Sequence, residues 1–154
     1  MNYHRIYFRL IIFFSILTWC TGFTLNVLTN GSEVSAASIP LLNFFYDNVC
    51  HQDEDKLISL SGFNFLVCAR CSGIYFGALI SSLFLLISFK KKEDPLRIFS
   101  IASIILFADV ILNNFLLSSY NKISAFITGL FFGSVCFLII LNQIEELNLT
   151  KAKS

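Results

Sequence analysis

Four long apolar segments, separated by shorter polar stretches, dominate the pattern along the chain. Each segment is close to the ~20 residues with which an α-helix crosses the hydrocarbon core of a bilayer. Backbone amides in lipid have to be hydrogen-bonded within the segment, which favours helices over open strands. The pattern therefore predicts an all-α fold, an integral membrane bundle of four transmembrane helices, at about 10–28, 67–89, 98–117 and 123–141.

The longest stretch between two apolar segments, residues 30–66, is not uniformly polar. Apolar residues recur at helical spacing between Ser38, a candidate N-cap, and Cys50. This spacing predicts a short helix at the outer membrane surface, although an ordinary loop helix packed on the bundle would show the same pattern. Asp53–Lys56 and Gly62 are expected to form turns.

Composition agrees with membrane residence. Hydrophobic residues make up 56% of the 154 residues and charged residues only 14%, which is more apolar surface than a soluble domain of this size could bury. The formal net charge is +1, and no basic run is interleaved with stacking aromatic residues. We therefore expect the lipid bilayer as a partner and no nucleic acid.

The distribution of Lys and Arg predicts the orientation, because cytoplasmic loops are enriched in these residues. In a four-helix topology, eight of the 11 lie on one side and only Lys56, Arg70 and Lys122 lie on the other. Both termini are therefore predicted to be cytoplasmic. The chain divides into a cytoplasmic N-terminus with the first helix, an outward-facing loop with the interfacial helix, a three-helix transmembrane core and a cytoplasmic tail, at 1–29, 30–66, 67–142 and 143–154.

The first apolar segment has a second interpretation. It could be the apolar region of a signal peptide, with the small residues of Val34–Ala36 as the cleavage site. The apolar run is long for that role, so we expect the helix to be retained. Cleavage would leave three helices and would not move the cysteine cluster described next.

Three cysteines and a histidine gather around the outward loop: Cys50, His51, Cys68 and Cys71. The C-x-x-C spacing of Cys68 and Cys71 is typical of zinc ligands, and Cys50 with His51 could complete a Cys3His site. Adjacent residues rarely bind one ion together, so Cys50 without His51 is a variant of this hypothesis. A metal site, most plausibly zinc with a structural or catalytic role, is the favoured interpretation.

Two other interpretations of the cluster remain open. A C-x-x-C pair at the outer start of a membrane helix also suits a thiol–disulfide oxidoreductase, because the helix N-terminus favours a thiolate. A disulfide from Cys50 to Cys68 or Cys71 would instead be a structural staple, in a protein that is structural or associated with transport. No nucleophile–His–acid set or phosphate-binding loop is present, and whether the protein is an enzyme stays open.

Other polar and small residues in the apolar segments predict contacts between helices. Asp109 in the third segment should face the bundle and find a partner, because a carboxylate in lipid is costly. We expect a polar network in which Asn113, one turn away, connects Asp109 to Arg70. Two G-x-x-x-G pairs predict close packing of the second and fourth helices within the chain, and the same motif would also allow a homo-oligomer; these glycines are Gly73, Gly77, Gly129 and Gly133.

Three linked strings, "CHQ", "CARCSGIYFG" and "ITGLFFG", together with the Asp109 between the last two, resemble the small prokaryotic membrane proteins of domain-of-unknown-function family 2085. The likeness covers about residues 50–133. It implies a multi-pass protein of a prokaryotic inner or cytoplasmic membrane and no established biochemical activity. The chemistry of the cluster therefore has to be argued from this chain.

Overall fold

The computed structural model describes residues 3–29, 33–60, 62–86, 95–116 and 120–151. The described elements are, in chain order, helix α1 (Tyr3–Leu28), helix α2 (Glu33–Asp47), a 3₁₀ turn (Glu54–Lys56), strands β1 (Leu57–Leu60) and β2 (Phe63–Cys68), helix α3 (Ala69–Leu86), helix α4 (Pro95–Ile111) continued by a π-helical turn (Leu112–Leu116), and helix α5 (Lys122–Lys151).

Four of these helices are long and apolar enough to cross a membrane, which confirms the predicted number. The spans are Ile6–Leu28, Ala69–Leu86, Leu96–Phe115 and Lys122–Ile144. The second span begins two residues later than its apolar pattern suggested, because β2 continues to Cys68.

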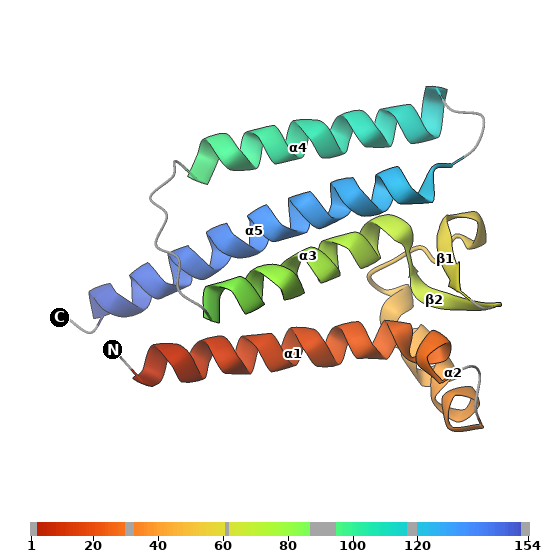
Figure 1. Ribbon diagram of the computed structural model, residues 1–154, viewed down its shortest axis with the longest axis horizontal. Helices are drawn as coiled ribbons and strands as arrows, with labels where there is room; N and C mark the ends of the chain where they lie inside the picture. Colours follow the sequence, from red (N-terminus) through yellow and green to blue (C-terminus); the bar gives the residue numbers. More distant parts are fainter. Residues whose placement is uncertain (1–2, 30–32, 61, 87–94, 117–119, 152–154) are drawn as a thin grey trace.

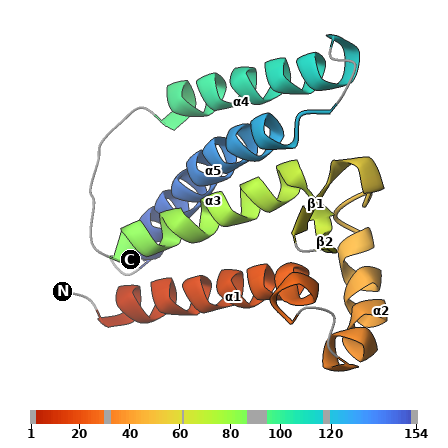
Figure 2. The ribbon, with the colours of Figure 1, turned by 45° about the vertical axis from the view of Figure 1, so that its right-hand side comes forward.

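The four spans form a row rather than a closed bundle. They lie side by side in the order α1, α3, α5 and α4 (Figures 1 and 2), and α3 contacts both α1 and α5 while α4 contacts α5. The start of α1 and the end of α5 lie at one end of the row, and α2 and the β-hairpin lie at the other (Figure 1). We call the latter the hairpin end.

Helices α3 and α5 approach closely through the four glycines. A Cβ added to Gly73 would lie 2.2 Å from the carbonyl oxygen of Phe126, and one added to Gly133 would lie 2.1 Å from that of Ile74. The hydroxyl of Ser134 also donates a hydrogen bond to the Gly77 carbonyl oxygen across the contact, at 3.1 Å. In this structure the second and fourth spans thus pack closely within the chain through these glycines.

The antiparallel hairpin of β1 and β2 was not predicted. Its turn contains Gly62, whose φ of +85° suits glycine. Along β2 the three consecutive residues Phe65, Leu66 and Val67 are all buried, so the strand lacks the alternation that marks a half-buried sheet. In the part of the chain that the structure describes, the fold is thus all-α apart from this hairpin, which leads directly into α3.

Helix α2 closes the hairpin end and begins earlier than expected. It starts at Glu33, so Ser38 and Pro40 lie inside it and Ser38 is not its N-cap. The buried Tyr46 donates a hydrogen bond to the Trp19 carbonyl oxygen of α1 at 2.8 Å, while Phe44 and Phe45 are exposed. The helix is therefore anchored to α1 by Tyr46 and leaves an apolar face uncovered by the rest of the described chain.

Candidate metal centre

Cys50 reaches the core because α2 ends just before it. Helix α2 stops at Asp47, and the Cys50 amide still donates to the Tyr46 carbonyl oxygen at 2.9 Å. The side chain is 7% exposed and packs with Phe23 and Val67. Two residues later Gln52 adopts a φ of +45°, which turns the chain away from the core.

Cys68 and Cys71 lie on either side of a strand-to-helix junction. Cys68 is the last residue of β2, and Cys71 is in the first turn of α3. Their C-x-x-C spacing is thus not a purely helical one, and the sulfur of Cys68 is placed by the end of a strand. Both residues are partly buried and pack against the same cluster as Cys50.

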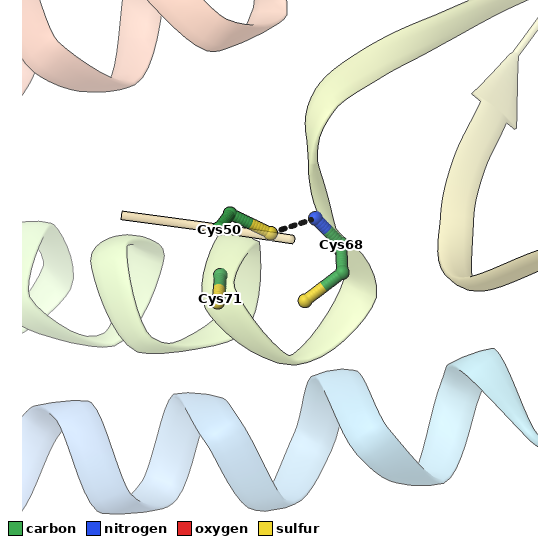
Figure 3. A group of neighbouring side chains, drawn as sticks. All are labelled: Cys50, Cys68 and Cys71. Atoms are coloured by element: carbon green, nitrogen blue, oxygen red, sulfur yellow. Dashed lines mark hydrogen bonds between the residues drawn. The ribbon is translucent and has the colours of Figure 1, made fainter. Parts of the chain in front are cut away.

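The three sulfurs face a common space (Figure 3), and all lie within 4.8 Å of one another. The backbone N–H of Cys68 donates to Cys50 Sγ over 3.2 Å. All five cysteines of the chain are free thiols. We call Cys50, Cys68 and Cys71 the thiol triad.

His51 does not join the thiol triad. Its side chain is exposed whereas that of Cys50 is buried, so the two neighbours project to different sides of the chain. Among the described residues, the group of close ligand atoms contains the three sulfurs alone. The Cys3His shell with His51 as fourth ligand is therefore not formed in this structure.

The two thiols outside the membrane-spanning segments are shifted in opposite directions. Cys50 has its pKa lowered because its sulfur accepts hydrogen bonds from the thiols of Cys68 and Cys71, and further ones from the Cys68 and Gln52 amides. Cys68 has its pKa raised, first because its thiol donates to Cys50. Of these two thiols, Cys50 is therefore the one that loses its proton more readily.

Arg70 reaches away from the thiols and towards the carboxylate of Asp109. Its Nη2 lies 2.9 Å from Asp109 Oδ2, which links α3 to α4. Asn113 does not bridge the pair as expected, because it binds the other carboxylate oxygen, with Nδ2 2.8 Å from Oδ1. The Ser124 hydroxyl donates to that same oxygen, so both oxygens of the buried carboxylate have partners.

Residues that the sequence did not single out complete this network. Asn121 caps α5, since its Oδ1 accepts from the amides of Ile123 and Ser124 at 3.1 and 3.2 Å. The backbone N–H of Asn121 donates to Asn113 Oδ1 at 2.9 Å. The signal that could have found it is an Asn directly before a long apolar run.

Aromatic side chains from α1, α2 and α3 cluster on one side of the thiol triad. The ring of Trp19 lies 4.8 Å from that of Tyr46 and 5.9 Å from that of Tyr75, centroid to centroid. Phe23, which is fully buried, contacts Tyr46 and Tyr75 as well. The triad therefore has an apolar wall on this side.

Comparison with known proteins places these residues in a family. No curated protein and no solved structure matches the chain. The family described as "Predicted membrane protein (DUF2085)" matches residues 50–139, a stretch that begins at Cys50 and includes the rest of the triad, Arg70, Asp109 and both glycine pairs. With four membrane-crossing helices and a match over more than half its length, the chain belongs to the DUF2085 family of membrane proteins.

Proposed function

We propose that the thiol triad binds a divalent transition metal, zinc, at the outward-facing end of the protein. The observation that carries the proposal is the convergence of three thiols from three different backbone settings on one space. Cys50 follows α2, Cys68 ends β2 and Cys71 begins α3. Soft thiolate ligands of this kind favour zinc among the abundant divalent metals.

The spacing of the sulfurs suits a metal better than a disulfide. Tetrahedral zinc with Zn–S bonds of ~2.3 Å places its sulfurs roughly 3.8 Å apart, and the three sulfurs already lie within 4.8 Å of one another. A disulfide joins two sulfurs at ~2.05 Å and leaves the third without a role. The Cys68 amide that donates to Cys50 Sγ would also support a thiolate ligand.

A metal held here would cross-link the hairpin end. It would tie the segment after α2 to the junction of β2 and α3, so its first role is structural. Three protein ligands leave a fourth position for water or a small ligand, which is the arrangement of catalytic zinc sites. With neighbouring His51 exposed, the described residues offer no fourth ligand of the usual kind near the triad.

Elemental analysis of the purified full-length protein, paired with thiol counting before and after reduction, tests the proposal. We expect one zinc per chain, lost in Cys68→Ser and retained in the control Cys136→Ser, whose thiol lies on α5 away from the triad. Absence of metal with a reducible Cys68–Cys71 bond would overturn the proposal in favour of a thiol–disulfide oxidoreductase. A reducible bond to Cys50 would instead identify a structural staple.

The outward orientation is a separate part of the proposal. Its support is the excess of Lys and Arg on the opposite side of the four spans. Asp55 is exposed at the hairpin end, so a cysteine introduced there, with Cys50 and the other thiols replaced by Ser, can report sidedness. Labelling of Asp55→Cys by an impermeant maleimide in intact cells is expected; labelling only after lysis would reverse the topology.

A further inference from the structure

Several buried side-chain atoms at the hairpin end lack a hydrogen-bond partner, and all can donate. They are Trp19 Nε1, Gln52 Nε2, Arg70 Nε and Tyr120 Oη. Leaving a buried donor unpaired costs roughly 1–3 kcal/mol, so each such atom calls for an explanation, and a bound ion or water is one of them. The three nitrogens can only donate, so whatever pairs with each of them is an acceptor.

Two of these donors are neighbours. The Arg70 guanidinium carbon lies 6.0 Å from the centroid of the Tyr120 ring, and Lys56 Nζ lies 5.8 Å from the same centroid. Both cations therefore lie near the Tyr120 ring. Burial raises the pKa of the Tyr120 hydroxyl to about 12, so the hydroxyl keeps its proton and can donate it.

The polar network engages other atoms than these two donors. Asp109 Oδ2 accepts from Arg70 Nη2, and its Oδ1 accepts from Asn113 and Ser124. Arg70 thus binds Asp109 through Nη2 and leaves Nε available to another acceptor, while 19% of its side chain is exposed. The described residues offer no hydrogen-bond partner to Arg70 Nε or to Tyr120 Oη.

We propose that Arg70 and Tyr120 hold an oxyanion, a phosphate or carboxylate group, at the hairpin end. An oxyanion accepts hydrogen bonds without needing to donate any, and the arginine fork suits it geometrically. Lys56, which lies near the same ring, adds positive charge, although it also pairs with Asp53 at 2.9 Å. The oxyanion could be a free solute or the headgroup of an anionic lipid, since the site lies where α3 and α5 begin.

The site adjoins the thiol triad. Arg70 lies between Cys68 and Cys71 in the chain, and the charge of either thiolate would act on Tyr120 and raise its pKa. The oxyanion site stands without the metal, because its two donors belong to neither the triad nor its hydrogen bonds. If both sites are occupied, an acidic ligand would be positioned next to the metal.

Two single-site variants test the proposal with little risk to folding. Tyr120→Phe removes the hydroxyl alone, and Arg70→Lys keeps a charge for Asp109 but removes Nε. We expect each to weaken binding about tenfold or more, because hydrogen bonds to a charged group are strong. Tyr46→Phe is the matched control, since the hydroxyl of Tyr46 is buried but already paired with the Trp19 carbonyl oxygen.

Binding is measured on the full-length protein with two probes. Calorimetric titration of detergent-solubilised protein with inorganic phosphate tests a free solute. Thermal melting in nanodiscs of phosphatidylglycerol against phosphatidylcholine, without phosphate, tests a lipid headgroup. Binding or stabilisation by either probe that is reduced in Tyr120→Phe and unchanged in Tyr46→Phe supports the proposal. No response to either probe, or an equal response in Tyr120→Phe, overturns it, as would an experimental density map showing only water between Arg70 and Tyr120.

A further variant separates this site from the proposed metal centre. Cys50→Ser removes a ligand of the triad but leaves Arg70 and Tyr120 in place, so phosphate should still bind. If phosphate binding is lost in Cys50→Ser and unaffected by Tyr120→Phe, the anion is a metal ligand. That result overturns the oxyanion site and leaves the metal proposal standing.

Discussion

The contact of α3 with α5 should be intolerant of one methyl group at Gly133. A Cβ at this position would lie 2.1 Å from the Ile74 carbonyl oxygen and 2.6 Å from the Ile74 Cα. Ordinary contact begins near 3.4 Å, so in Gly133→Ala the two backbones would have to separate by the difference, about 1.3 Å. Backbone atoms inside helices cannot turn aside, and the separation would loosen the whole contact.

The cost follows from two opposing effects. Overpacking a tight contact costs roughly 1–3 kcal/mol, and a backbone obstacle places Gly133→Ala at the upper end of that range. Alanine returns roughly 0.5–1 kcal/mol because it is the better helix former. We therefore expect a net loss of about 2 kcal/mol in the free energy of unfolding. The measurement is unfolding by SDS in mixed micelles, followed by circular dichroism.

Gly22 provides a control at nearly the same distance. A Cβ there would lie 2.3 Å from Tyr46 Oη, which is the end of a side chain rather than backbone. The hydroxyl can shift and forfeit its hydrogen bond to Trp19, a loss of about 1 kcal/mol that the alanine gain largely offsets. Gly22→Ala should therefore be nearly neutral. Equal losses at Gly22 and Gly133, or none at Gly133, would refute the argument that backbone contact holds α3 to α5.

Three further predictions concern charge, protonation and the metal. Asp109→Leu leaves Arg70 unpaired; because Arg70 is partly exposed, we expect a loss of about 2–3 kcal/mol in unfolding free energy, less than for a fully buried pair. Burial raises the Tyr46 pKa from 10.0 to about 12, so stability is full below pH ~10 and falls as the pH rises towards ~12, and Tyr46→Phe should reduce that fall. Co²⁺ added to metal-free protein should quench Trp19, the only tryptophan, and Cys68→Ser should abolish the quenching.

Each of these three has a contrary result. The Arg70→Met/Asp109→Leu double variant should recover most of the stability lost by Asp109→Leu, and a further loss would show that the ion pair is not what Asp109 contributes. An alkaline stability profile unchanged by Tyr46→Phe would contradict the burial of its hydroxyl. Quenching that persists in Cys68→Ser would place the bound cobalt elsewhere.

The sequence predicted those features that depend on local spacing. Apolar length gave the four spans, and glycines four residues apart gave the contact of Gly73 and Gly133 with the facing backbones. The partnership of Arg70 with Asp109 followed from the cost of a carboxylate in lipid. Each of these features follows from the residues of a single segment, or from the cost of placing one charged group in lipid.

Features that depend on how segments meet were not predictable. Strand β2 was assigned in part to the following helix because its consecutive buried residues Phe65–Val67 resemble the start of an apolar helix. The sequence suggests His51 as a ligand because it is the neighbour of Cys50. Adjacency in the chain does not reveal that the Cys50 side chain is buried whereas that of His51 is exposed. No pattern in the sequence indicates Tyr120, because its proposed role in binding an oxyanion depends on Arg70 and Lys56, which lie far from it in the chain.

The lateral order of the spans constrains how the chain can assemble as it is synthesised. Because α5 lies between α3 and α4 (Figure 1), this helix, which follows both of them in the chain, has to enter between two that precede it into the bilayer. Until it does, α4 lacks its most extensive helix contact, and Asp109, although paired with Arg70 of α3, lacks the hydrogen bond from the Ser124 hydroxyl. A carboxyl group in lipid is costly unless its oxygens are paired. The insertion of α5 is therefore the step that completes the hydrogen bonding of Asp109 and packs α4 against a neighbouring helix.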